Sequence, residues 1–98
     1  MAEFIYVVRP PRPTFVADAT QEEANVVAAH LAYLHELRAE GRLLLAGRTD
    51  GGEFGIVVFL AEDAEHADQT VHADPAVYQG VFTADCYPFR LALLPIHD

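Results

Sequence analysis

Residues 20–60 carry the pattern that decides the fold: TQEEANVVAAHLAYLHELRAEGRLLLAGRTDGGEFGIVVFL. Thr20 and Glu23 are spaced as in a capping box, in which each side chain accepts a hydrogen bond from the other residue's backbone amide. Apolar residues then recur every three or four positions, which predicts a long amphipathic helix that ends at Gly41. The predicted stripe consists of Val27, His30, Leu31, Leu34 and Leu37.

A β-hairpin is predicted directly after this helix. Residues 43–47 (LLLAG) and 54–60 (FGIVVFL) are short apolar runs of the length and composition of strands. Between them, residues 49–53 contain Asp50-Gly51-Gly52, and glycine accepts the positive φ angles of tight turns. The second and third strands should therefore be antiparallel neighbours.

The segments on either side supply the remaining elements. Residues 4–8 (FIYVV) predict a first strand, which the prolines of residues 9–13 end, leaving a stiff loop to about Ala19. Asp63 is a good N-cap for a second helix, whose predicted buried side is Ala64, Ala67 and Val71. Residues 74–80 predict a brief helical turn. Residues 81–94 predict a long final strand, with Pro88 at an edge or a bulge.

This order, β-α-β-β-α-β, predicts a ferredoxin-like α+β fold for a single domain over residues 1–98. Its four-stranded antiparallel sheet would carry helices on one face only. Residues 56–59 (IVVF) are apolar on both sides of their strand, which is too much for a face exposed to water. We therefore expect a homodimer with sheets packed face to face, as in dimeric α+β barrels. The alternative is a monomer that buries these strands at its centre.

Charge and composition exclude several classes of function. The net charge is −9, from 15 acidic residues against six arginines, so a nucleic acid or an anionic membrane would be repelled. A single cysteine, Cys86, excludes an internal disulfide and suits a reducing compartment. The first residues do not have the pattern that predicts a signal peptide, and the sequence has no apolar run of about 20 residues, so we expect a soluble cytoplasmic protein.

His30 is the first candidate for chemistry, because it lies near the middle of the apolar stripe. It is either a buried neutral imidazole that bonds a backbone carbonyl or a general acid or base, since imidazole titrates near neutral pH. Asp74 is the second candidate. As the N-cap before Pro75 it suits a purely structural role, yet a rigid carboxylate can also accept a hydrogen bond from an imidazole Nδ1–H.

The other histidines predict no metal site. His35 follows His30 by five residues, and His66 precedes His72 by six, so neither pair has the i, i+4 spacing of helical metal ligands. His97 falls in the C-terminal tail. Cys86, in the last predicted strand, is expected to be a buried small apolar residue. We expect neither a metal nor a cofactor.

Five segments together resemble the YciI-like (YCII-related) proteins. They are residues 29–34 (AHLAYL), 40–47 (EGRLLLAG), 73–75 (ADP), 80–81 (GV) and 88–89 (PF). The resemblance implies a ferredoxin-like fold, dimerisation through the sheets, and a pocket with a histidine and an aspartate proposed as catalytic. These two positions correspond to His30 and Asp74. Related dimeric ferredoxin-like enzymes include isomerases and lyases that act on small ring compounds without a cofactor.

The chain departs from this family pattern at two positions. Family members often carry an arginine one turn before the histidine, where this chain has Val27. They also often have a proline after the Ala-Gly pair, where this chain has Arg48. The first departure removes a cation and the second adds one, so both bear on which substrate is preferred.

The leading hypothesis is a cofactor-free enzyme that transfers a proton on a small organic molecule, in an elimination or an isomerisation. His30 and Asp74 would be catalytic, in a pocket between the first helix, the sheet and the Asp74 turn. Tyr6, Arg48 and Phe82 would bind the substrate. One alternative is a non-catalytic domain that binds a small molecule. Another is a dimeric interaction domain, which predicts that side chains fill the pocket.

Overall fold

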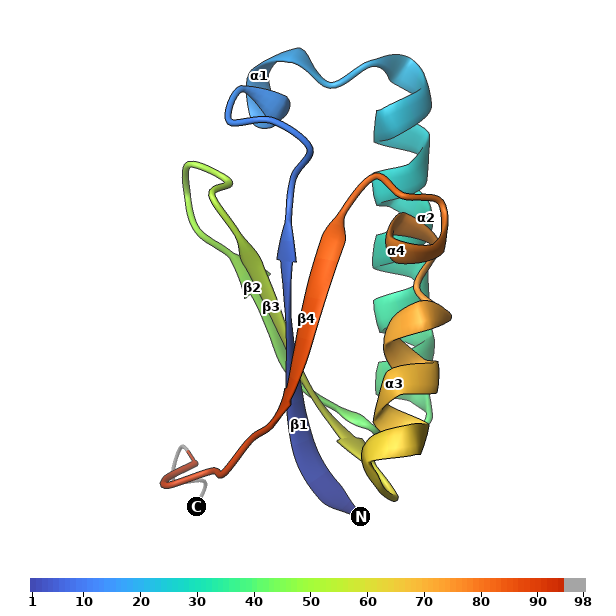
Figure 1. Cartoon of the computed structure of the whole chain (residues 1–98), viewed down its shortest axis with the longest axis vertical. Coiled ribbons are helices and arrows are strands. Elements are labelled where there is room, and N and C mark those ends of the chain that lie inside the picture. The colour runs from blue at the N-terminus through green and yellow to red at the C-terminus, as the bar shows by residue number, and fades with distance from the viewer. Residues whose placement is uncertain (95–98) are drawn as a thin grey trace.

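The computed structural model describes residues 1–94 and confirms the ferredoxin-like α+β fold. Its four strands are all antiparallel, in the order β2-β3-β1-β4, and helices α2, α3 and α4 lie on one side of the sheet (Figure 1). In chain order the elements are β1 (Ala2–Arg9), α1 (Phe15–Asp18), α2 (Gln21–Ala39), β2 (Leu43–Arg48), β3 (Gly55–Ala61), α3 (Ala64–His72), α4 (Pro75–Tyr78) and β4 (Thr83–Pro88).

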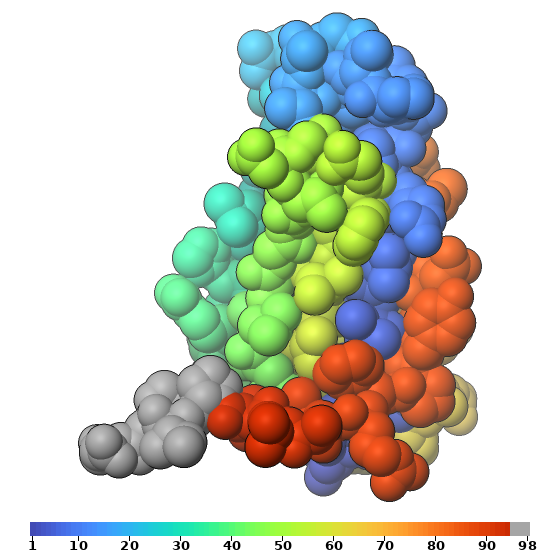
Figure 2. Space-filling model, turned by 90° about the vertical axis from the view of Figure 1, so that its left-hand side faces the viewer, coloured from blue at the N-terminus to red at the C-terminus, as the bar shows by residue number. Residues whose placement is uncertain are grey.

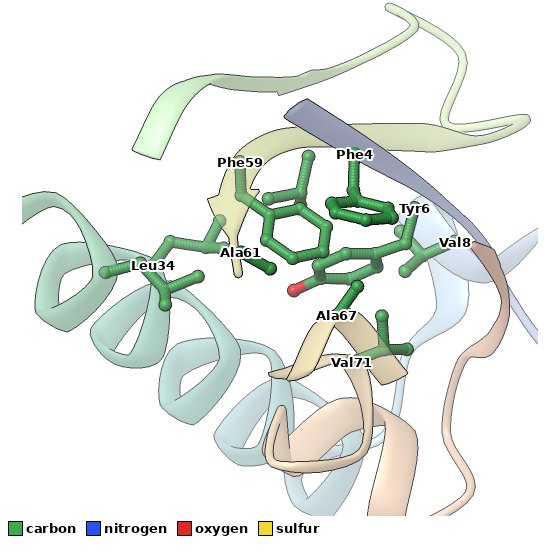
Figure 3. Close-up of a cluster of buried hydrophobic side chains, with 10 residues drawn as sticks. Phe4, Tyr6, Val8, Leu34, Phe59, Ala61, Ala67 and Val71 are labelled. Carbon is green, nitrogen blue, oxygen red and sulfur yellow. The ribbon is translucent and has the colours of Figure 1, made fainter. Parts of the chain in front are cut away.

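The core lies between the sheet and helices α2 and α3 (Figure 3). Alternate residues of a strand point to opposite faces, so every second residue of β1 and β3 enters this core. Its buried members are Phe4, Tyr6, Val8, Leu34, Leu37, Val57, Phe59, Ala61, Ala67 and Val71.

Helix α2 begins with the predicted capping box. The Glu23 amide donates to the Thr20 hydroxyl, and the Thr20 amide donates to the Glu23 carboxylate. The predicted stripe is only partly correct, because Val26, Leu34 and Leu37 are the buried residues of this helix. Val27 and Leu31 instead line a cavity near the N-terminal half of α2.

Three details of the predicted elements are wrong. The loop before α2 contains a helical turn, α1, which ends at Asp18. The last strand ends at Pro88 and not at Leu94, although the Phe89 amide still donates to the Glu3 carbonyl of β1 at 3.0 Å. Ala64 is exposed, and the buried positions of α3 are Ala67, Thr70 and Val71.

No helix covers the sheet face away from α2 and α3 (Figure 2). Its side chains are mostly apolar, and Glu3 and Asp85 are charged members of it. Ile5 and Val7 of β1 point to this face, since their neighbours in the strand enter the core. Their cross-strand partners include Val58, Ile56 and Tyr87. Figure 2 shows the segment after β4 crossing one end of the face. No helix within residues 1–94 is both long and apolar enough to cross a bilayer.

Candidate active site

His30 and Asp74 are 44 residues apart in sequence, and the fold brings them into contact. His30 lies in the middle of α2, and Asp74 is the N-cap of α4, which packs beside α2. The His30 Nδ1 atom is 2.6 Å from the Asp74 Oδ2 atom. The Asp74 side chain is fully buried, whereas 13% of the His30 side chain is exposed. His30 therefore lies between the aspartate and solvent.

Asp74 accepts two further hydrogen bonds. The Ala76 amide donates to Oδ1 at 3.0 Å, as expected of an N-cap, and the Tyr6 hydroxyl donates to Oδ2 at 2.8 Å. Burial, and next the negative charge of Asp74, raise the pKa of Tyr6, so the phenol keeps its proton and remains a donor. With the Tyr6 hydroxyl and the Ala76 amide as donors, the Asp74 side chain is placed to accept a third hydrogen bond from His30 Nδ1–H. In the neutral imidazole tautomer that donates through Nδ1, the lone pair lies on Nε2.

Aromatic contacts fix the plane of the His30 ring. Its edge-to-face contact with Phe82 has a centroid distance of 5.5 Å, and Phe82 makes a similar contact with Phe15 at 5.8 Å. Hydrogen bonding on one side and ring packing on the other leave the imidazole little freedom to rotate. This is the arrangement that a positioned acid or base requires.

A cavity of about 500 Å³ lies beside His30. Such a volume falls within the usual range for sites that bind small molecules. Its walls come from the N-terminal half of α2, the β2–β3 hairpin and the α1 segment. The lining residues are Val8, Pro10, Phe15, Val16, Ala19, Ala24, Val27, His30, Leu31, Leu34, Ala46, Gly47, Arg48, Gly52, Phe54, Gly55, Ile56, Val57 and Phe82. Both departures from the family pattern, Val27 and Arg48, are among them.

The α1 segment closes one side of this cavity, and Arg12 holds it there. The Arg12 guanidinium donates two hydrogen bonds to the Glu23 carboxylate at the start of α2, at 2.9 and 2.7 Å. It donates two more to Asp18, to the carboxylate at 2.8 Å and to the backbone carbonyl at 3.1 Å. Val16 lies against the hairpin turn, where a Cβ on Gly52 would come within 2.3 Å of its methyl group. We call residues 12–18 the α1 strap.

Three of the five predicted site residues, His30, Arg48 and Phe82, line the cavity. Asp74 lies behind His30 and does not reach the cavity surface. The expectation that Tyr6 contacts a substrate is wrong, because Tyr6 is fully buried and its hydroxyl bonds Asp74. The α1 strap is not predicted from the sequence. The one signal for it is the aromatic Phe15, which follows the proline-rich residues 10–13.

Within residues 1–94, no three His, Cys, Asp or Glu side chains are placed to hold a metal ion. The other described histidines form hydrogen bonds with residues three or four positions away in sequence. His35 bonds the Arg38 guanidinium, His66 accepts from the Glu62 amide, and His72 bonds the Asp68 carbonyl. His97 lies outside the described residues. Cys86 is partly buried, and this burial raises the pKa of its thiol.

The model of the YCII-related domain family matches residues 4–88. The chain belongs to the YCII-related family. Among curated proteins, none has a sequence that matches this YCII-related chain significantly.

Two solved structures share the fold of this YCII-related protein. One is 5-chloro-2-hydroxyhydroquinone dehydrochlorinase (TftG) from Burkholderia phenoliruptrix AC1100, in complex with 2,5-dihydroxybenzoquinone. It is 24% identical, with a TM-score of 0.65 over 89% of this chain and 93% of that one. The other is muconolactone isomerase, 17% identical, with a TM-score of 0.70 over 98% of this chain and 96% of that one. At these identities the likeness supports the fold alone.

Proposed function

We propose that this YCII-related protein is a cofactor-free enzyme that catalyses an elimination or an isomerisation of a small organic molecule by proton transfer. One observation carries the proposal: the His30 ring lines the cavity while its Nδ1 atom bonds a fully buried aspartate. The free Nε2 atom is the general base that such an arrangement provides.

In the proposed reaction, His30 Nε2 takes the proton of a substrate C–H bond, and the electron pair of that bond forms a carbon–carbon double bond. In an elimination, a leaving group departs from the adjacent carbon with its bonding electrons. In an isomerisation, an existing double bond shifts and the imidazolium returns the proton to another carbon. Both reactions balance without an oxidant, a reductant or a metal.

Asp74 is the positioning residue in this scheme. Its carboxylate holds the ring in the Nδ1–H tautomer and stabilises the imidazolium that forms when the substrate is deprotonated. It does not touch the substrate, since its side chain is fully buried. Its three donors keep it in one orientation.

The two neighbours in fold support the reaction class by analogy. One is named a dehydrochlorinase and the other an isomerase. Abstraction of a proton by a general base can begin both kinds of reaction, although a shared fold is by itself weak evidence for a shared function. The cavity argues against the alternative of a domain without a small-molecule site, because that alternative predicts a pocket filled by side chains.

Proton exchange in D₂O tests the proposal before the natural substrate is known. We would incubate a panel of cyclic enones, lactones and hydroxyquinones with the protein and follow the loss of C–H signals by NMR. The wild type should accelerate exchange for at least one compound. His30→Ala should abolish that acceleration, and Asp74→Asn should lower it by about 100-fold or more.

His35→Ala is the matched control, because it removes an exposed imidazole from the same helix. It should leave the exchange rate unchanged. Exchange that persists at the wild-type rate in His30→Ala, in a variant with wild-type circular dichroism, would refute the proposal.

We also propose that two copies of the chain associate through the free face of the sheet. On this face Leu45 is 50% exposed and Tyr87 is 54% exposed, and both lie beside the apolar side chains of β1 and β3. Strands that are apolar on the side away from their helices are typical of sheets covered on both faces. Association of two copies would cover this surface.

A further inference from the structure

The cavity beside His30 is unusual in its charge. The chain contains 15 acidic residues, yet no carboxylate lines the cavity. Of the lining side chains only His30 and Arg48 are polar, and the others are aliphatic, aromatic, proline or glycine. Although the protein is strongly acidic, the only charged side chain in the lining other than His30 is thus the cation Arg48.

Arg48 lies on the cavity side of the sheet. It pairs with Gly55 across β2 and β3, and its Cβ would be 3.6 Å from a Cβ on that glycine. The Arg48 Nη1 atom donates to the carbonyl groups of Thr49 and Asp50, each at 2.9 Å, which ties the guanidinium to the hairpin turn. Within residues 1–94, Arg48 has no carboxylate within 4.0 Å, and its Nε and Nη2 atoms donate to no protein group.

The two other arginines at this end of the molecule are otherwise engaged. Arg12 is bound to Asp18 and Glu23. Arg9 lies over the ring of Phe54, with its Cζ atom 5.8 Å from the ring centroid, and does not line the cavity. Arg48 is therefore the one arginine whose guanidinium remains available to an occupant of the cavity, within the part of the chain that the structure describes.

We infer that the cavity binds a small, mostly apolar ring compound that bears one anionic group, a carboxylate or an ionised hydroxyl, and that Arg48 binds this group. Arg48 is exposed to solvent, lines an otherwise mostly apolar cavity and has no protein counter-ion, so its guanidinium favours an anion over a neutral group of the same shape. The apolar walls select the ring. Binding of such a compound does not depend on the proposed function. Only the further step, in which Arg48 orients the bound compound so that a C–H bond faces His30, rests on it.

Paired carboxylates and carboxamides test the inference by binding alone. The probes are benzoate, cyclohex-1-enecarboxylate and 1-naphthoate, each beside its carboxamide, titrated into ¹⁵N-labelled protein. At least one carboxylate should bind about tenfold more tightly than its carboxamide, with shifts at cavity residues such as Gly55. Arg48→Gln should reduce this ratio to about one. His30→Ala should preserve a preference for the carboxylate.

Arg38→Gln is the control, because it removes one positive charge from the exposed face of α2 and leaves the cavity unchanged. It should keep the wild-type ratio. The inference is wrong if no carboxylate outbinds its carboxamide, or if the preference survives in Arg48→Gln. Neither result bears on proton exchange by His30, which the D₂O assay measures separately, and a failed exchange assay would leave the anion preference intact.

Discussion

The two carboxylate oxygens of Asp74 have different roles. Its Oδ1 atom caps α4, and its Oδ2 atom accepts from both His30 and Tyr6. The cap follows from the Asp-Pro dipeptide, so the sequence predicts it. The two side-chain partners are 44 and 68 residues away. Only the folded chain, in which α4 packs against α2 and the Tyr6 hydroxyl reaches Asp74, brings them together.

Tyr6→Phe tests whether the tyrosine acts on His30 through Asp74. The change removes one donor from a buried carboxylate, which should lower the free energy of unfolding by about 1.5–3 kcal/mol. The remaining negative charge then attracts the imidazolium more strongly. We expect the pH midpoint of the His30 ring titration, followed by NMR, to move upward. Tyr33 and Cys86 also lie near Tyr6. Burial raises the pKa of both groups, so neither adds a charge near Asp74 at neutral pH.

Tyr33→Phe is the control for this experiment. The Tyr33 hydroxyl donates to the Thr70 carbonyl at 2.6 Å and not to Asp74. Its loss should cost about 1 kcal/mol and leave the His30 midpoint in place. Equal midpoints in the wild type and Tyr6→Phe would show that the tyrosine is only structural.

Among the elements, the α1 strap is the part that the sequence describes least well. The helix α2 and the β2–β3 hairpin follow from apolar periodicity, a capping box and turn glycines, which are local signals. Residues 12–18, which form the strap, show no apolar periodicity, capping box or turn glycine. Contacts with distant residues hold it in place: Arg12 with Glu23, Val16 with Gly52, and Phe15 with Phe82. Such contacts become apparent only once the chain is folded.

Acid should loosen the strap. The hydrogen bonds from Arg12 lower the pKa of Glu23 to about 2, and those from Thr14 and Arg12 lower that of Asp18. Because both pKa values are lower in the folded state, these carboxylates stabilise it above about pH 4.5, and the effect is lost as the pH falls toward 2. We expect the Val16 methyl resonances to move toward random-coil positions over that interval.

Arg12→Gln separates this effect from general acid unfolding. In that variant the Val16 resonances should already be displaced at pH 7 and should change less on acidification. An identical acid response in the wild type and the variant would mean that the Arg12 contacts do not hold the strap.

The strap should also respond to Gly52→Ala. Gly52 has a φ of +75°, and a Cβ there would lie 2.3 Å from the Val16 methyl group. We expect the alanine to push the strap away from the hairpin and to weaken carboxylate binding in the cavity. Gly41→Ala is the matched control, since Gly41 has the same φ but open space around its Cβ position. It should cost about 1–2 kcal/mol of stability and leave binding unchanged. Equal binding by the two variants would contradict this account of the strap.

For the molecule as a whole, the sheet has one face under helices and one apolar face without them. The strand order and the position of β3 inside the sheet follow from the β-α-β-β-α-β pattern. The end of β4 at Pro88 does not, because residues 89–94 remain largely apolar and give no local signal to stop other than that proline. The cavity was expected beside the Asp74 turn, but it opens toward the hairpin and the strap.

A charge on the free face should separate the proposed dimer. Leu45→Arg places a cation beside Val58, its partner across the β2–β3 ladder. We expect light scattering to give the mass of two chains for the wild type and of one chain for the variant. Tyr78→Arg is the control, because Tyr78 is 63% exposed on α4, on the helical side of the molecule, and should leave the mass unchanged. A wild type that is monomeric at micromolar concentration would refute the dimer.

If Asp74 binds His30 through Nδ1–H and leaves the Nε2 lone pair toward the cavity, the tautomer of the neutral His30 ring must show it. Long-range ¹H–¹⁵N NMR of the imidazole distinguishes the two neutral forms without any substrate. We expect the neutral form of the wild-type ring to carry its proton on Nδ1, and the neutral form in Asp74→Asn to be a mixture of tautomers. A wild-type ring with its proton on Nε2 would contradict the account, because Nε2 could then not take a proton from a substrate.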